Sequence, residues 1–142
     1  MRIFVDANVL FSAARSAGAI RTLMQMVQST GHALAADAYV VAEARRNLEA
    51  KAGADALVYL QGLLAQVDVR QVSYAEAAHA HSLVGWLPEK DRPVLLAAVA
   101  MHCDVLLTGD RTHFGAGYGK TFAGVTVYAP AQLARLLWAS PD

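Results

Sequence analysis

The sequence predicts an α/β fold in which helices cover the faces of a mainly parallel sheet. Short apolar runs at residues 3–5, 34–36, 105–107 and 125–128 are typical of buried strands, and residues 67–72 alternate loosely, like an edge strand. Helix-like segments lie near residues 17–29, 38–51, 54–66, 75–87, 92–102 and 131–138. Strands that alternate with helices are typical of layered α/β proteins with parallel strands.

The length and composition of the chain predict one domain. Its 142 residues suit a single substantial core, and a chain that is 56% hydrophobic can offset its ordering entropy by burial. We therefore expect a single domain over residues 1–142. The longest uninterrupted apolar run, residues 94–101, is far shorter than the roughly 20 residues that span a bilayer. No membrane association is expected, and a cytoplasmic location is the default interpretation.

The overall charge offers nucleic acid no general attraction, since 12 basic and 12 acidic residues give a formal net charge of zero. The composition still permits a local patch that faces phosphates. Its candidate members are Arg15, Arg21, Arg45, Arg46, Lys51, Arg92, Arg111 and Lys120. Cys103 is the single cysteine, which excludes an internal disulfide and a cysteine-based zinc site.

The placement of the acids is the most informative feature of the sequence. Asp6 follows the expected strand at residues 3–5, and Asp110 follows the one at residues 105–107. Ligand sites in open parallel sheets gather beyond the carboxyl ends of the strands, so these two side chains can converge there. Both aspartates would also suit ordinary turns, and that alternative stays open.

Two further acids lie on expected helices. Asp91 comes just before Pro93 and an apolar run, which places it at the start of a helix. It could equally do no more than cap that helix. Glu43 lies beside an apolar stripe, where a carboxylate usually needs a partner or a metal, although a surface pairing with Arg46 or Asn47 would also explain it.

A group of carboxylates predicts a hard divalent cation. Mg²⁺ and Mn²⁺ prefer oxygen ligands, and acids packed together raise one another's pKa unless a cation neutralises them. A cation in such a site can activate water for attack on phosphorus and can stabilise the departing oxygen. The sequence-based candidates for the ligands are Asp6, Glu43, Asp91 and Asp110.

These acids occur within four short motifs: VDANVL at residues 5–10, AEARRNL at 42–48, KDRPVLLAA at 90–98 and LLTGDRTHF at 106–114. In this order the motifs resemble those of PIN-domain nucleases, and in particular the VapC-like toxins of type II toxin–antitoxin systems. The last expected strand and helix are also similar to the end of that family.

The resemblance implies a three-layer α/β/α fold with a five-stranded sheet in the order 3-2-1-4-5. It implies endonucleolytic cleavage of RNA with Mg²⁺ or Mn²⁺, an antitoxin as protein partner and a homodimer. Thr108 would form a hydrogen bond within the site, and Asn8 would orient Asp6. By the same resemblance, the metal-binding and catalytic acids would be Asp6, Glu43, Asp91 and Asp110.

Other interpretations of the sequence remain open. His113 suits a loop better than a catalytic role, and residues 115–120 are expected to form a flexible connector rather than a phosphate-binding loop. The chain could be a non-catalytic module that binds RNA or protein. It could also be a phosphatase with an aspartate nucleophile, although Asn8 stands where such enzymes usually have a second acid.

Overall fold

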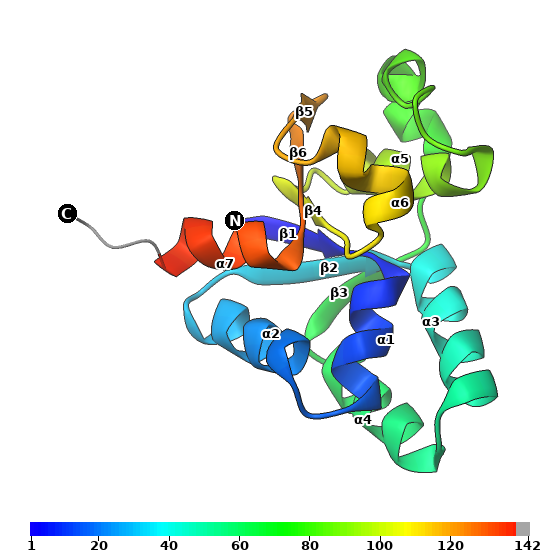
Figure 1. Cartoon of the computed structure of the whole chain (residues 1–142). Coiled ribbons are helices and arrows are strands. Elements are labelled where there is room, and N and C mark those ends of the chain that lie inside the picture. The colour runs from blue at the N-terminus through cyan, green and yellow to red at the C-terminus, as the bar shows by residue number, and fades with distance from the viewer. Residues whose placement is uncertain (139–142) are drawn as a thin grey trace.

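The computed structural model describes residues 1–138, and Figure 1 shows helices on both sides of a central sheet. The strands are β1 (Arg2–Val5), β2 (Ala33–Asp37), β3 (Val67–Arg70), β4 (Val105–Leu107), β5 (Thr121–Phe122) and β6 (Val125–Tyr128). They lie in the order β3-β2-β1-β4-β6-β5. Only the β5–β6 pair is antiparallel among these strands.

The predicted strand order is confirmed, because the five expected strands correspond to β1, β2, β3, β4 and β6. The sheet has one strand more than the five expected, because β5, a two-residue strand, pairs with β6 at the edge. Ala123 and Gly124 connect the two strands with φ angles of 50° and 87°, as tight hairpin turns require. A strand this short has no alternation that a sequence analysis can detect.

The helices form two layers. They are α1 (Ala7–Arg15), α2 (Ala19–Ser29), α3 (Ala38–Lys51), α4 (Ala54–Leu64), α5 (Arg92–Ala100), α6 (Arg111–Phe114) and α7 (Pro130–Trp138), with 3-10 turns η1 (Tyr74–Leu83), η2 (Glu89–Asp91) and η3 (Gly115–Gly117). Helix α1 packs against α2, α3 and α4 on one side of the sheet, and α5 and α6 lie on the other side (Figure 1). The predicted three-layer arrangement is therefore confirmed.

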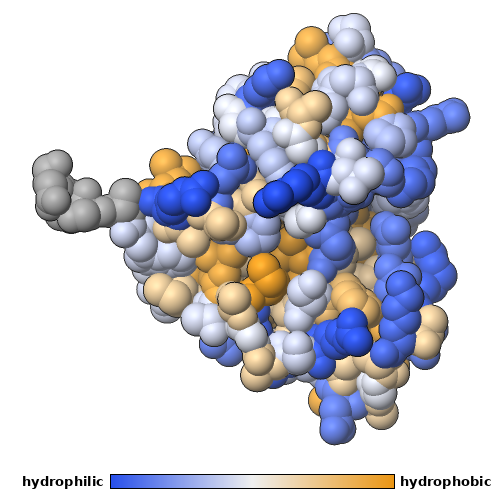
Figure 2. All heavy atoms as spheres, viewed as in Figure 1, coloured by the Kyte–Doolittle hydropathy of each residue, from blue (hydrophilic) through white to orange (hydrophobic). Residues whose placement is uncertain are grey.

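The core explains why the strands are uniformly apolar. Ile3, Phe4 and Val5 of β1 are fully buried, and every residue of α5 from Val94 to Ala100 is buried. Strands covered on both faces have no solvent side, so their sequence shows continuous apolar runs instead of alternation. Figure 2 shows hydrophilic and hydrophobic side chains interspersed over one face, with hydrophilic ones predominating along α3. No helix within residues 1–138 is long and apolar enough to cross a membrane.

Helix α1 was not expected from the sequence. It begins directly after Asp6, whose side chain accepts a hydrogen bond from the Ala7 amide at the helix start. Its buried residues Ala7, Leu10 and Ala14 have helical spacing, but the Asp-Ala-Asn segment suits a turn as well as a helix N-cap, and the structure shows the N-cap. The expected helix at residues 75–87 was also wrong, since η1 is a 3-10 segment with a non-helical residue at Ala77.

Residues 115–120 do not form the loose connector that the sequence suggested. The segment includes η3, and Gly117 is buried against the indole of Trp86. Trp86 meets the ring of Phe114 edge-on, with centroids 6.3 Å apart, and stacks on Phe122 at 5.0 Å. This aromatic group ties α6 to the segment that leads into α5.

We expect Gly117→Ala to destabilise the protein by about 1–3 kcal/mol, because a Cβ there would overlap the indole of Trp86. The matched control is Gly62→Ala on α4, where a Cβ meets open space and helix propensity improves by about 1 kcal/mol. Urea unfolding of both variants checks this. Equal stabilities would show that the Trp86 ring shifts without cost.

Candidate functional site

All four acids singled out in the sequence line one cavity of about 360 Å³ at the carboxyl ends of β1 and β4. Asp6 follows β1, Asp110 follows β4, Asp91 precedes α5 and Glu43 projects from α3. The remaining lining residues include Asn8, Phe11 and Asn47, with the basic side chains of Lys51 and Lys90. The fold therefore brings together residues that are up to 104 positions apart in the chain, as the numbers of Asp6 and Asp110 show.

Asp6 is the most constrained of these acids. It is 5% exposed, and its Oδ2 accepts hydrogen bonds from Thr108 Oγ1 at 2.8 Å and from Asn8 Nδ2 at 3.0 Å. Its Oδ1 accepts from the Ala7 amide at 2.7 Å. The hydrogen bonds predicted for Thr108 and Asn8 are therefore present, and they hold the carboxylate in one orientation.

The same residues tie the loop after β4 to α1. Asn8 Oδ1 accepts a hydrogen bond from the Gly109 amide at 2.8 Å, and the Asp110 amide donates to Thr108 Oγ1 at 3.2 Å. A Cβ at Gly109 would lie only 3.2 Å from Asn8 Oδ1, which favours glycine at this close approach. The position of Asp110 thus depends on the network around Asp6.

Burial raises the pKa of Asp6 from 3.8 to about 6. The hydrogen bonds from Thr108 and Ala7 lower this pKa, and the negative charge of Glu43 raises it further, but desolvation is the largest effect. The ionised form of Asp6 is therefore costly in the protein alone.

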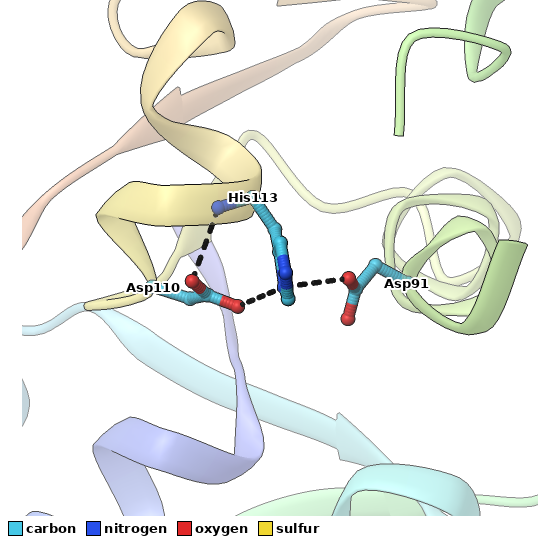
Figure 3. A group of neighbouring side chains, drawn as sticks. All are labelled: Asp91, Asp110 and His113. Atoms are coloured by element: carbon cyan, nitrogen blue, oxygen red, sulfur yellow. Dashed lines mark hydrogen bonds and ion pairs between the residues drawn. The ribbon is translucent and has the colours of Figure 1, made fainter. Parts of the chain in front are cut away.

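Asp91 and Asp110 face each other across a histidine (Figure 3). Nδ1 of His113 lies 3.0 Å from Oδ2 of Asp91 and 2.9 Å from Oδ2 of Asp110. The His113 backbone amide donates to Oδ1 of Asp110 at 3.1 Å, which positions the start of α6. These three side chains form a compact group with potential ligand atoms within 4.8 Å of one another. Asp6 and Glu43 line the same cavity without belonging to that compact group.

The short contacts of His113 are ion pairs when the imidazole is protonated, but neither has the geometry of a hydrogen bond. Nδ1 of His113 and Oδ2 of Asp91 are buried, and neither has a hydrogen-bond partner within residues 1–138. The ring nitrogen is close to both carboxylates, but its hydrogen would not point at either of them. The other oxygen of Asp91 is 3.5 Å from Nζ of Lys90.

The geometry does not support a purely helix-capping role for Asp91 or a surface pairing for Glu43. Within residues 1–138, the Asp91 side chain makes no capping hydrogen bond to α5, although it precedes that helix. In the same part of the chain, no side-chain hydrogen bond or ion pair joins Glu43 to Arg46 or Asn47. Both carboxylates point to the cavity lining instead.

The sequence analysis missed His113 as a member of the site. The signal was available, because residues three apart on a helical turn share a face and Asp110 is three residues before it. The turn was not expected to be helical, since α6 has only four residues. Lys90, which directly precedes Asp91, also lines the cavity and was not recognised from the sequence.

No protein-family model matches the sequence, and no curated protein matches it. VapBC2 from Rickettsia felis, solved with a DNA fragment from its promoter, has a TM-score of 0.66 at 14% identity, over 91% of this chain and 98% of that chain. VapC20 of Mycobacterium tuberculosis, described as a sarcin–ricin loop cleaving toxin, has a TM-score of 0.59 at 16% identity, over 84% and 98% of the two chains. FitAcB from Neisseria gonorrhoeae has a TM-score of 0.56 at 18% identity, over 91% and 98%.

The chain has the PIN fold. The resemblance inferred from the four motifs is confirmed at the level of the fold, since these solved structures are nearly completely covered by this chain. The identities are too low to transfer an activity, which has to be argued from the residues of the cavity.

The raised pKa of Asp6 predicts a pH dependence of stability in metal-free protein. The carboxyl group ionises at its ordinary pKa of 3.8 when unfolded and at about 6 when folded, so the folded state binds more protons between these values. Its stabilising contribution is complete below pH 3.8 and is lost as the pH rises through 6. The loss amounts to about 3 kcal/mol.

Urea unfolding in EDTA between pH 4 and pH 8 would measure this effect, with Asp6→Asn as the matched variant. We expect the free energy of unfolding of the wild type to fall by about 2–3 kcal/mol relative to the variant across this range, because part of the full effect lies below pH 4. Contributions from groups that do not interact with Asp6 are common to both proteins and cancel in the difference, whereas the repulsion between Asp6 and Glu43 is part of the measured effect. Parallel curves for the two proteins would contradict a costly Asp6 charge.

Proposed function

We propose that this protein is a metal-dependent endoribonuclease and the toxin of a toxin–antitoxin pair. The observation that carries the proposal is the cavity at the strand ends, lined by four acids on a fold shared with solved toxins. In this proposal Mg²⁺ or Mn²⁺ is held by Asp6, Glu43, Asp91 and Asp110, which also form the catalytic centre.

The chemistry of the cavity supports a divalent cation. The acidic side chains offer the oxygen ligands that Mg²⁺ and Mn²⁺ prefer. A positive charge in the cavity would lower the raised pKa of Asp6. It would also give the unpartnered Oδ2 of Asp91 a partner. When bound, the cation supplies a lowered pKa for water and charge stabilisation for the phosphate.

The residues of the chain supply orientation and phosphate contacts. Thr108 and Asn8 donate hydrogen bonds to Oδ2 of Asp6 and hold this carboxylate in one orientation. The carboxylate therefore needs no reorganisation to act as a ligand. Lys51 and Lys90 line the cavity and provide cationic partners for the phosphates of a strand. A second hollow of about 510 Å³ shares Lys51 and is lined by Arg15 and Asp55, so it offers a further basic side chain beside one acid.

The solved neighbours support the choice of RNA and of a protein partner. The description of VapC20 as a sarcin–ricin loop cleaving toxin favours RNA as the substrate class. The structures of VapBC2 and FitAcB are complexes of a toxin with its antitoxin, which favours a cognate antitoxin for this chain. A homodimer and a cytoplasmic location belong to the same proposal.

The cleavage test uses a panel of single-stranded RNAs incubated with Mg²⁺, with Mn²⁺ or with EDTA. We expect cleavage only with a divalent cation, and a rate at least about 100-fold lower for the Asp6→Asn/Asp91→Asn variant, because even outer partners of metal ligands contribute about 10–100-fold. A thermal melt of the variant controls for folding. Equal cutting by both proteins would mean contamination, and no cutting of any RNA would favour a non-catalytic binding module.

The phosphate contacts can be tested separately with Lys51→Gln. We expect this change to weaken binding of a single-stranded RNA and to reduce the slope of log affinity against log salt by about 0.7. Filter binding in EDTA measures both without cutting the strand. The matched control is Lys120→Gln, which removes the same charge outside the acidic cavity. Equal losses for the two variants would contradict a specific role for Lys51.

A further inference from the structure

We propose that His113 is a metal ligand beside Asp91 and Asp110, and that its imidazole makes this subsite favour Mn²⁺ over Mg²⁺. This inference rests on the proposed metal dependence and adds a nitrogen donor to the acids named there. Nδ1 of His113 and Oδ2 of each aspartate are the three ligand atoms.

The ring nitrogen of His113 lies at ligand-to-ligand distance from one oxygen of each aspartate. The nitrogen is 3.0 Å from one carboxylate oxygen and 2.9 Å from the other. Ligands at right angles around an octahedral cation, each about 2.1 Å from it, are about 3.0 Å from one another. Each aspartate oxygen is thus as far from Nδ1 of His113 as adjacent ligands of one small cation are from each other, and all three atoms lie within 4.8 Å of one another (Figure 3).

Two of these three atoms, Oδ2 of Asp91 and Nδ1 of His113, have no hydrogen-bond partner within residues 1–138. Asp91 is 8% exposed, and Nδ1 of His113 is also buried. A buried polar atom without a partner is costly, so a cation between these atoms would remove the cost at each of them. Lys90 does not fill this role, because it approaches the other oxygen of Asp91 and its side chain is 63% exposed.

The imidazole also bears on the choice of metal. Mg²⁺ and Mn²⁺ both favour oxygen ligands, but Mg²⁺ takes nitrogen ligands reluctantly and retains water, whereas Mn²⁺, as a first-row transition cation, accepts an imidazole more readily. Two carboxylates with one imidazole therefore shift the preference of the subsite toward the transition cation. Of the two cations proposed above, Mn²⁺ benefits from His113 and Mg²⁺ does not.

The test measures cation binding in the absence of RNA, with the full-length protein. Titration with Mn²⁺ followed by electron paramagnetic resonance gives the Mn²⁺ affinity, and competition with Mg²⁺ gives the ratio of the two affinities. We expect His113→Ala to weaken Mn²⁺ binding by about 10–100-fold and Mg²⁺ binding by much less. We expect His113→Asp to restore a ligand of the oxygen type and so to bring the two affinities closer together.

A spectroscopic signature distinguishes a ligand from a residue that only shapes the site. Electron spin echo of the Mn²⁺ protein should show modulation from a coordinated ¹⁴N, which His113→Ala removes and His79→Ala retains. His79 is exposed and lies outside the group formed by Asp91, Asp110 and His113, so it is the matched control. Thermal melts of each variant confirm that it is folded.

The possible failures are distinct. If the wild type binds Mn²⁺ and cuts RNA while His113→Ala leaves the affinity unchanged or tighter, the inference is overturned and the nuclease proposal stands. In that case His113 is an ion-pair partner of the two aspartates in the metal-free protein. If the wild type binds neither cation, both the inference and the proposed metal dependence are overturned.

Discussion

The hydrogen bond from Thr108 to Asp6 joins the carboxyl ends of the two central strands, and the rest of the site depends on it. The strands are already in register there, since Val5 pairs with Leu107 and the Asp6 amide donates to the Leu107 carbonyl at 3.0 Å. The carboxylate of Asp6 caps α1 on one side and receives Thr108 on the other. Thr108 Oγ1 in turn accepts from the Asp110 amide, so one buried group sets the start of α1 and the loop that carries Asp110.

Burying the ionised carboxylate of Asp6 costs folding free energy. A carboxylate that is 5% exposed is partly desolvated, and the pKa of Asp6 is raised although three hydrogen bonds oppose the shift. A site designed for stability alone would place an amide or an apolar residue here. An acid at this buried and hydrogen-bonded position therefore argues that its charge is used, which is the physical basis of the proposed metal site.

The scaffold supplies the other acids from regular structure. Asp91 stands where Pro93 opens α5, whose residues from Val94 onward are buried between the sheet and η1. Glu43 is carried by α3, which packs on α1. Side chains on strand ends and helix starts are held more rigidly than side chains on long loops, so the shape of the cavity follows from the packing of the core.

The sequence predicted the strands and the acids because their signals are local. A doubly buried strand is a run of apolar residues, and an aspartate that ends it is visible from its neighbours alone. The missing helix α1 shows the limit, because an aspartate accepts backbone hydrogen bonds in a turn and in a helix cap alike. The presence of Asp6 in the sequence therefore does not distinguish a turn from the start of a helix. The place of His113 in the site depends on its contact with Asp91, which belongs to a different segment. A local sequence pattern cannot predict the distance between these two side chains.

Charge then connects the cavity to its proposed substrate. The chain has a formal net charge of zero, so RNA gains no long-range attraction and must be held by local contacts. Lys51, Lys90 and Arg15 offer such contacts at the edge of the acids, but Asp6, Asp91 and Asp110 would repel the phosphate that has to reach the centre. A divalent cation reverses the sign of the field at that point. In the proposed enzyme, cation binding and productive RNA binding are therefore coupled, and each should tighten the other by the same factor.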